Sequence, residues 1–357
     1  MAKIVLTGGG TAGHVTPNLA LVPELIKRGF EISYIGRNEG IEKQLVEEAC
    51  IPYYSISAGK LRRYADPKNV TDIFRILKGF TQAISLLKRL SPDVVFSKGG
   101  FVTAPVVWAA RLCKIPVIVH ESDLTPGLAN KLSIPFADCV CYSFPETGKF
   151  LGKKKSFFTG LPIRPELLKG SAEKGRQITG LEGSLPVLLV IGGSQGSKFL
   201  NDLTRENLVK LLAKFQICHI CGKGNIDPSL KRYKGYVQFE YVTHELPHLY
   251  ALADVVISRA GATTIFELLA LNKPNLLVPL SRNASRGDQI LNAESFRKQG
   301  FSSVVEEEDM SSEILMETLL DILKKREEIV KNMKQADITN STIKVADIIE
   351  RTIKENV

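Results

Sequence analysis

Two glycine-rich turns are the segments of this chain best suited to binding an anion. The first covers residues 8–13 and follows an apolar run at 4–6, while the second covers residues 192–197 and follows an apolar run at 187–191. Where a strand passes into a helix, such a turn points backbone N–H groups and the positive helix end at an anion, usually a phosphate. Two of them predict two Rossmann-like domains facing each other across a cleft, with a nucleotide on one side and a second substrate on the other.

Titratable side chains stand beside two of the predicted turns. His14 directly follows the first turn, and His120, Glu121 and Asp123 follow the apolar run at 115–119. An imidazole and two carboxylates this close together are suited to removing a proton from a hydroxyl group. Alternatively, Asp123 or Ser122 caps the next helix and Glu121 is a solvated loop charge. The residues leave both interpretations open.

Three more segments follow predicted strands at the edge where open α/β sheets bind ligands. Residues 97–101 contain a third glycine turn, with Gly99 and Gly100. Residues 258–267 begin a helix whose N-terminus would face a diphosphate, with Glu267 binding ribose; a capping box from Thr264 to Glu267 is the structural alternative. Residues 285–293 combine Arg, Asp, Gln and Asn, which suit sugar hydroxyls, or form a hydrophilic loop.

The elements that would position these residues alternate between apolar strands and longer helices. We expect strands at 4–7, 31–35, 94–96, 117–120, 139–142, 187–191, 216–221, 237–239, 255–258 and 275–278. Helices are expected between them, at about 18–28, 40–49, 72–90, 104–112, 197–214, 245–252 and 263–271. Continuous apolar runs indicate strands buried on both faces, so the pattern predicts an α/β fold with doubly wound parallel sheets.

The βαβ pattern restarts after Gly160-Leu161-Pro162-Ile163-Arg164-Pro165, where two prolines indicate a stiff connection. We therefore predict an N-terminal domain over residues 1–160 and a C-terminal domain over 161–340. The last helical stretch, near 341–357, could pack back onto the N-terminal domain.

Composition excludes several classes of protein. With 44% hydrophobic and 24% charged residues, the chain is an ordinary globular protein. It shows no signal peptide and no apolar segment of about 18 residues, so we expect a cytoplasmic protein. The six cysteines are expected as reduced thiols, with the C-x-x-C at 218–221 in a buried strand. We found no D-x-D pair for a metal–diphosphate bridge and no zinc-ligand spacing, so we expect no metal and no cofactor.

A net charge of +9 would attract phosphorylated ligands, anionic lipid or nucleic acid. No nucleic-acid recognition motif is present, which disfavours that partner. An NAD site is disfavoured because the second strand ends in Gly36-Arg37 instead of an acid. Residues 60–90 combine eight basic residues with apolar ones such as Phe74 and Leu77. This segment is either a site that docks on an anionic membrane or a core helix with a solvated face.

Taken together and in order, the motifs resemble those of the MurG glycosyltransferases over essentially the whole chain. The matching segments are residues 8–17, 99–102, 120–121, 192–196, 258–263, and Gln289 with Asn292-Ala293. The resemblance implies a GT-B fold and transfer of N-acetylglucosamine from its UDP ester to lipid-linked N-acetylmuramyl-pentapeptide. This reaction belongs to peptidoglycan synthesis at the cytoplasmic face of the cell membrane, with the enzyme bound peripherally.

The resemblance also assigns substrate-binding roles. UDP-N-acetylglucosamine would contact Thr11, Ala12, Gly13, Arg164, Ser194, Val242, Ala262, Thr263, Thr264, Glu267 and Gln289. The acceptor would face His14, Gly99, Gly100, His120, Glu121 and Asp123. The chain departs from the family pattern at three of the matched positions. Ala12 replaces the usual Gly, Phe101 replaces a frequent Tyr, and Asp123 replaces the usual Asn and adds a negative charge.

The expected mechanism is a single inverting displacement without a metal ion. Helix N-termini, Ser194 and Arg164 would stabilise the departing diphosphate, and His14 or Glu121 would act as the base. The alternatives are a UDP-N-acetylglucosamine 2-epimerase-like enzyme and a related transferase with a different lipid acceptor. An epimerase would need carboxylates around the sugar, for which Glu121 and Asp123 are the candidate pair.

Overall fold

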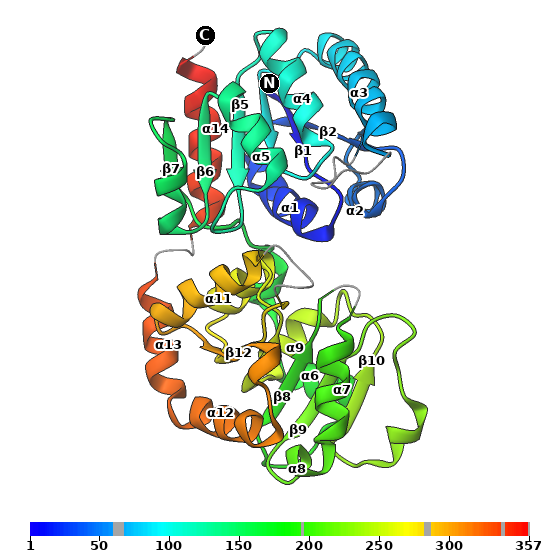
Figure 1. Cartoon of the computed structure of the whole chain (residues 1–357), viewed down its shortest axis with the longest axis vertical. Coiled ribbons are helices and arrows are strands. Elements are labelled where there is room, and N and C mark those ends of the chain that lie inside the picture. Colours follow the sequence, from blue (N-terminus) through cyan, green and yellow to red (C-terminus); the bar gives the residue numbers. More distant parts are fainter. Residues whose placement is uncertain (60–67, 194–195, 282–286, 337–339, 356–357) are drawn as a thin grey trace. The chain divides into compact units, whose positions relative to one another are not determined.

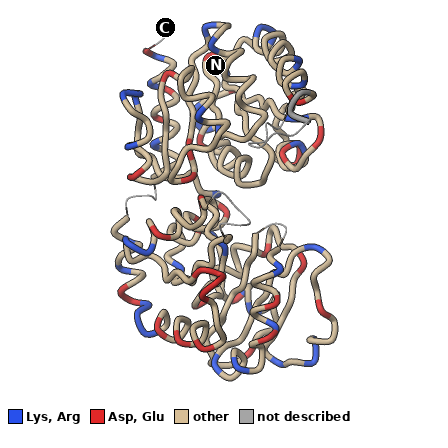
Figure 2. The backbone as a smooth tube through the Cα atoms, in the orientation of Figure 1, with Lys and Arg blue, Asp and Glu red and all other residues tan. Residues whose placement is uncertain are grey.

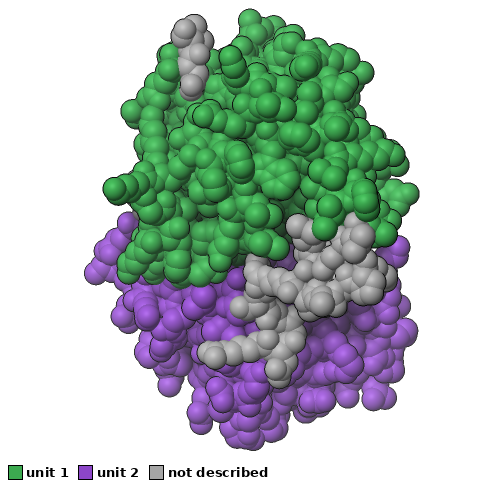
Figure 3. All heavy atoms as spheres, turned by 45° about the horizontal axis from the view of Figure 1, so that its top comes forward, with its two compact units in different colours: residues 1–164, 338–357 green, residues 165–337 purple. Residues whose placement is uncertain are grey.

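The computed structural model describes residues 1–59, 68–193, 196–281, 287–336 and 340–355. The chain divides into two compact units, Met1–Arg164 with Ile338–Val357, and Pro165–Asp337 (Figure 3). Each unit contains its own parallel sheet, so the prediction of two doubly wound parallel-sheet domains is confirmed. None of the described helices is both long and apolar enough to span a membrane.

In the described residues, the first unit contains a sheet of seven strands in the order β3-β2-β1-β4-β5-β6-β7 (Figure 1). The strands are β1 (Lys3–Thr7), β2 (Glu31–Arg37), β3 (Tyr53–Ile56), β4 (Val94–Ser97), β5 (Val117–Glu121), β6 (Cys139–Tyr142) and β7 (Ser156–Phe158). The α-helices are α1 (Ala12–Lys27), α2 (Ile41–Glu48), α3 (Lys68–Leu90), α4 (Thr103–Leu112), α5 (Leu128–Ser133) and α14 (Ser341–Glu355). The 3-10 turns are η1 (Ile134–Phe136) and η2 (Pro145–Phe150).

Helices cover both faces of this sheet because consecutive apolar residues of a strand point in opposite directions. Leu6 of β1 belongs to a buried cluster with Leu21 of α1 and Ile349 of α14. Its neighbour Val5 belongs to another cluster, with Leu87 of α3 among its members. Burial on both faces explains the unbroken apolar sequence of the central strands.

The C-terminal helix α14 completes the first unit although it is far from that unit in sequence. Its apolar residues Val345, Ala346 and Ile349 join the cluster that contains β1 and α1. On the surface, the Arg28 guanidinium at the end of α1 pairs with Asp347 at 2.7 Å and with Glu350 at 3.4 Å. The chain therefore returns to the first unit after passing through the second.

In the described residues, the second unit contains a sheet of six strands in the order β10-β9-β8-β11-β12-β13. The strands are β8 (Val187–Ile191), β9 (Gln216–Ile220), β10 (Tyr236–Phe239), β11 (Val255–Ser258), β12 (Asn275–Leu277) and β13 (Ser303–Val304). The α-helices are α6 (Ala172–Thr179), α7 (Lys198–Glu206), α8 (Leu208–Leu212), α9 (Leu246–Leu252), α10 (Ala262–Ala270), α11 (Asp288–Lys298), α12 (Ser312–Lys324) and α13 (Arg326–Gln335). The 3-10 turns are η3 (Pro165–Lys169), η4 (Pro228–Arg232) and η5 (Glu307–Asp309).

Several predicted boundaries are wrong. Helix α1 begins at Ala12 and not near residue 18. Val15 and Pro17 are buried, and this burial stabilises the first turns of the helix although Pro17 lies within it. The single helix expected at 197–214 is divided at Asn207 into α7 and α8. Strands β3, β7 and β13 are missing from the prediction because they lie at sheet edges and are short and only partly buried. The C-x-x-C pair does lie at a buried strand, β9, as free thiols.

Candidate active site

In the first unit, the glycine turns after β1 and β4 are in direct contact. The two strands are neighbours at the point where the strand order reverses, the usual ligand-binding edge of such sheets. The Gly9 N–H donates to the Gly99 carbonyl at 3.3 Å. A Cβ atom on Gly100 would lie 2.0 Å from the Gly9 carbonyl oxygen, so this approach requires glycine. The structure therefore brings residues 8–13 and 99–100 together at one edge of the sheet.

His14 lies in the first turn of α1, at the edge of this pair of loops. Its carbonyl would be only 2.4 Å from a Cβ atom on Gly8, so the helix start packs tightly against the glycine turn. The His14 Nδ1 atom is buried while the residue is partly exposed. Thr11 is exposed, and Ala12 and Gly13 are partly exposed, so the start of α1 can meet a ligand.

Asn18 and Tyr34, which the sequence analysis did not identify, hold the first glycine turn by hydrogen bonds. Asn18 Nδ2 donates to the Thr7 carbonyl and contacts Tyr34 Oη, both at 3.2 Å. Tyr34 Oη in turn donates to the Gly8 carbonyl at 2.9 Å. Both side chains are completely buried, so the main chain of the turn is held by hydrogen bonds. No local sequence signal marks either residue.

A carboxylate of the protein itself occupies part of the first glycine turn. Glu42 is completely buried, and its Oε2 accepts a hydrogen bond from the Gly10 N–H at 3.4 Å. The Arg37 guanidinium pairs with Glu42 at 2.8 Å and lies over the Phe101 ring at 5.2 Å from its centroid. The Gly10 N–H, which the sequence pattern directs at a phosphate, is therefore directed at Glu42.

Glu121 organises the turn after β5. Its Oε1 accepts from the Asp123 N–H at 3.0 Å, and its Oε2 accepts from the Gly127 N–H at 3.0 Å and from Asn130 Nδ2 at 2.8 Å. The side chain is 2% exposed, and burial together with the charge of Asp123 raises the pKa of Glu121 to about 7. Glu121 is therefore not a solvated loop charge.

The capping alternative for this turn is also wrong. The next helix, α5, has Gly127 as its N-cap and no side-chain cap, so neither Ser122 nor Asp123 caps a helix. Glu121 instead fixes the turn by binding two of its backbone N–H groups.

His120 has a structural place in the same strand. Its Nε2 donates to the Gly160 carbonyl at 3.0 Å, and burial keeps the pKa of the imidazole well below its usual value. The side chain is completely buried, so His120 does not itself face an acceptor, contrary to the resemblance-based assignment. It connects β5 to the segment that leaves the first unit.

Arg164, another predicted donor-binding residue, is the last residue of the first unit before the chain enters the second unit, and it is partly buried.

Among the described residues of the second unit, the candidates for binding the UDP-sugar follow β10 and β11 or lie at the start of α11. A Cβ atom on Gly192 would be 2.5 Å from the Ser197 nitrogen, and one on Gly196 would be 2.1 Å from the Cys221 carbonyl oxygen. The turn after β8 therefore needs its glycines to fold back on itself. Ser194, like Gln195, lies outside the described residues.

Helix α10 presents its N-terminus at this edge. Gly261 is the N-cap and provides no side-chain cap, and Ala262, Thr263 and Thr264 form the first turn. The predicted capping box from Thr264 to Glu267 is wrong, because both residues lie inside the helix. Glu267 is buried one turn further along. A helix N-terminus without a side-chain cap is suited to an anionic group of a ligand.

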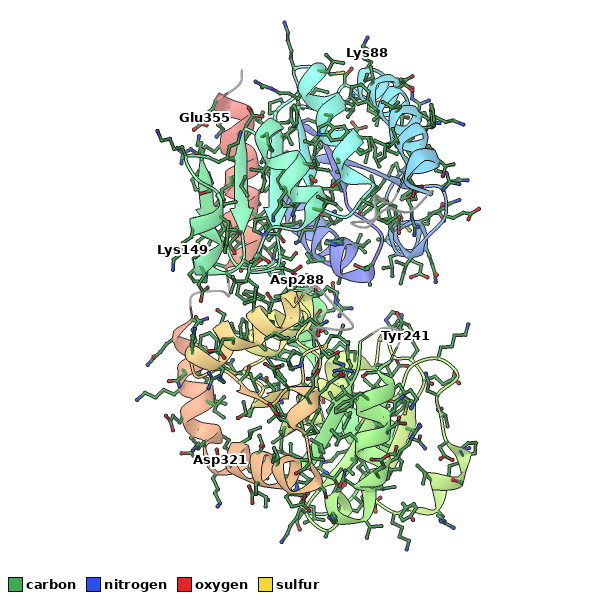
Figure 4. All side chains as sticks on the ribbon, in the orientation of Figure 1. Lys88, Lys149, Tyr241, Asp288, Asp321 and Glu355 are labelled. Atoms are coloured by element: carbon green, nitrogen blue, oxygen red, sulfur yellow. The ribbon has the colours of Figure 1, made fainter. Side chains whose placement is uncertain are left out.

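The second unit contains two more candidates. Val242 is buried just after β10. Gln289 is in the first turn of α11, beside Asp288 (Figure 4), and its Oε1 accepts from the Leu280 N–H at 3.1 Å. This bond orients the Gln289 amide and leaves its Nε2 donors for another acceptor. Ser285 and Arg286 lie outside the described residues.

The Arg259 side chain connects the segments that follow several strands of the second sheet. Its Nε and Nη2 atoms donate to Ser197 Oγ at 3.0 and 2.7 Å, and Nη1 donates to the Val278 carbonyl at 3.1 Å. Nη2 also pairs with Glu307 at 2.5 Å. One buried guanidinium therefore links the segments that follow β8, β11, β12 and β13. The sequence analysis selected its motif but did not identify this role.

Comparison with known proteins agrees with this architecture. Residues 4–142 match the N-terminal domain of glycosyltransferase family 28, and residues 187–352 match its C-terminal domain. A relative from Clostridium tetani is 56% identical over 349 residues, which are 98% of each chain. It is named UDP-N-acetylglucosamine–N-acetylmuramyl-(pentapeptide) pyrophosphoryl-undecaprenol N-acetylglucosamine transferase. A relative from Clostridium botulinum has the same name and is 55% identical over 354 residues, which are 99% of this chain and 100% of the relative. This chain belongs to the MurG family of glycosyltransferases.

Solved structures extend the comparison to the fold. The crystal structure of MurG from Acinetobacter baumannii has a TM-score of 0.77 and 27% identity, covering 98% of this chain and 100% of that one. A putative UDP-N-acetylglucosamine 2-epimerase from Listeria monocytogenes has a TM-score of 0.67 and 14% identity, covering 99% of this chain and 97% of that one. The second likeness shows a shared fold alone.

Two departures from the usual MurG pattern now have a structural setting. The Phe101 ring would be 2.8 Å from a Cβ atom on Gly10, so it packs directly on the first glycine turn. Asp123 is partly exposed, on the turn that Glu121 holds. The described residues contain no group of three or more His, Cys, Asp or Glu side chains that could hold a metal ion.

Proposed function

We propose that this MurG-family chain transfers N-acetylglucosamine from UDP-N-acetylglucosamine to undecaprenyl-diphosphate-linked N-acetylmuramyl-pentapeptide. The observation that carries the proposal is 56% identity over 98% of the chain to a relative of that name. The reaction would serve peptidoglycan synthesis, and through it cell-wall biogenesis, cell shape and division.

The donor would bind the second unit. The N–H groups at the start of α10 and the turn after β8 are directed at the same sheet edge, where a diphosphate would gain from both. Negative charge grows on the diphosphate as UDP leaves, and these fixed N–H dipoles would stabilise it. This chemistry requires no metal ion, and one displacement by the acceptor hydroxyl inverts the anomeric carbon.

We assign the base to His14 and a positioning role to Glu121. Both oxygens of the buried Glu121 side chain already accept hydrogen bonds within the turn. The His14 side chain is partly exposed at the start of α1, whereas that of Glu121 is buried. The preference rests on access to substrate.

Transfer should persist in excess EDTA. The test incubates the protein with labelled UDP-N-acetylglucosamine and the lipid-linked acceptor, with and without the chelator, and measures labelled lipid. Loss of transfer in EDTA that Mg²⁺ or Mn²⁺ restores would contradict the metal-independent mechanism. UDP release without any acceptor would instead favour the 2-epimerase-like alternative.

Helix α3 is the proposed contact with the membrane surface that carries the acceptor. Its Ala83 and Leu87 are buried in the core, whereas Ile73, Phe74 and Leu77 are 50%, 68% and 55% exposed. Basic residues gather along the same helix (Figure 2), and Lys88 points outward near its end (Figure 4). The helix thus packs by one face and exposes an apolar and basic surface, which suits peripheral binding to anionic lipid. The basic residues at 60–63 lie outside the described residues.

Reversing Arg75 and Lys78 to Glu should reduce binding to anionic vesicles. Each basic residue near an anionic surface contributes about 1 kcal/mol, so removing two and adding two acids should lower the partition constant at least tenfold. Sedimentation with anionic and neutral vesicles at low and high salt measures the effect.

Two other variants complete this test. Arg75 also pairs with Asp72 at 3.2 Å, so Phe74→Ser tests the surface with that pair intact. Lys331→Glu with Lys334→Glu repeats the charge change at the same spacing on exposed positions of α13. Equal loss of binding in this control would show that net charge, and not α3, governs docking.

A further inference from the structure

A buried lysine lies under the turn that carries Glu121 and Asp123. Lys98 directly follows β4, its side chain is completely buried, and its Nζ donates a hydrogen bond to Ser122 Oγ. The sheet explains this contact, because β4 and β5 are parallel neighbours whose carboxyl ends meet at one edge. The backbone of Lys98 is fixed as well, since its N–H donates to the Thr7 carbonyl at 2.8 Å.

Lys98 faces more negative than positive charge. Burial lowers its pKa to about 8, and the carboxylates of Glu121 and Asp123 oppose that shift. Two other groups interact with it electrostatically. Burial keeps the pKa of His120 well below its usual value and the pKa of the Cys141 thiol well above its usual value, so both are neutral. The buried Lys98 ammonium therefore interacts with the carboxylates of both Glu121 and Asp123.

The two carboxylates differ in exposure. Glu121 is buried and hydrogen-bonded within the turn, whereas Asp123 is partly exposed. Since the MurG pattern usually has Asn at this position, Asp123 adds a charge that an amide would not carry. Two neighbouring carboxylates repel each other, and a nearby cation offsets that repulsion. Lys98 is the buried cation at this place.

We propose that Lys98 is a positioning residue of the acceptor site, whose ammonium balances Glu121 and Asp123 so that Asp123 meets the acceptor as a carboxylate. A carboxylate only accepts hydrogen bonds, whereas an amide also donates them. Asp123 therefore selects an O–H or N–H group of the acceptor, and Lys98 makes that selection compatible with a buried Glu121. This inference rests on the proposed function.

The test is a double-mutant cycle of Lys98→Met and Asp123→Asn, measured as acceptor kcat/KM across pH. Lys98→Met should lower kcat/KM at pH 7 at least tenfold and shift the acid limb of the profile upward by about one pH unit, because loss of a cation raises the pKa of the buried Glu121. Asp123→Asn alone should also lower acceptor kcat/KM, and the double variant should be no slower than Asp123→Asn alone and show a smaller pH shift than Lys98→Met, because Lys98 acts through the Asp123 carboxylate. A purely structural lysine would instead give losses that add in the double variant.

Controls separate this inference from the proposed function. Lys131→Met removes one exposed positive charge from neighbouring α5 and should leave the rate unchanged. A parent protein that transfers no sugar overturns the proposed function itself. An active parent whose double variant shows the summed losses of the two single variants, with an unshifted pH profile in Lys98→Met, overturns the role of Lys98. If Lys98→Met does not fold, a folded double variant supports charge balance, and an unfolded one overturns it.

Discussion

His14→Ala should lower kcat about 10²- to 10⁴-fold while the protein remains folded, the usual effect of removing a general base. The side chain lies at the start of α1 and is partly exposed, so its loss leaves the core intact. Steady-state transfer assays with saturating donor and acceptor measure the change.

Glu121→Gln provides the matched comparison. Both Glu121 oxygens accept hydrogen bonds from backbone N–H groups, but the glutamine amide has one oxygen and one NH₂ group. The NH₂ group would face an N–H donor and lose that hydrogen bond, so we expect the free energy of unfolding to fall by about 2 kcal/mol. Thermal unfolding measures this, and UDP binding by calorimetry tests the donor site. If Glu121→Gln is fully stable but inactive and His14→Ala is active, then Glu121 is the base and His14 is not.

Arg259→Met should destabilise the second unit by about 3 kcal/mol and raise the KM for the donor. The variant leaves Glu307 and the Val278 carbonyl without their cationic partner, and removal of one member of a buried pair is costly. Ser197 also loses both guanidinium contacts at the start of α7, which should loosen the glycine turn after β8. Denaturant unfolding and donor kinetics measure the two effects.

Arg297→Met is the control for that prediction. Arg297 also pairs bidentately with a glutamate, Glu294, but its side chain is 58% exposed. An exposed pair contributes less than about 1 kcal/mol, so stability and donor KM should barely change. Equal effects of the two substitutions would mean that Arg259 does not fasten the strand ends.

Local patterns in the sequence predict the fold class and the positions of the candidate glycine turns. An apolar run followed by glycines and then a helix is sufficient to place residues 8–13, 99–100 and 192–193 at strand ends. Edge strands such as β3 and β7 escape this reasoning because partial exposure removes the unbroken apolar signal. The start of α1 escapes it because core burial outweighs the local effect of Pro17.

The charge partners within the site depend on the tertiary structure. Gly10 and Glu42 lie on different elements, as do Lys98 and Ser122, and sheet register brings each pair together. Helix α14 likewise packs against α1 although the whole second unit lies between them in the sequence. The sequence by itself determined the family, the alternation of elements and the glycine turns, because these depend on neighbouring residues. Which ionisable side chains are buried, and beside which partners, was decided by the tertiary structure, because burial and charge pairing depend on contacts between residues distant in the chain.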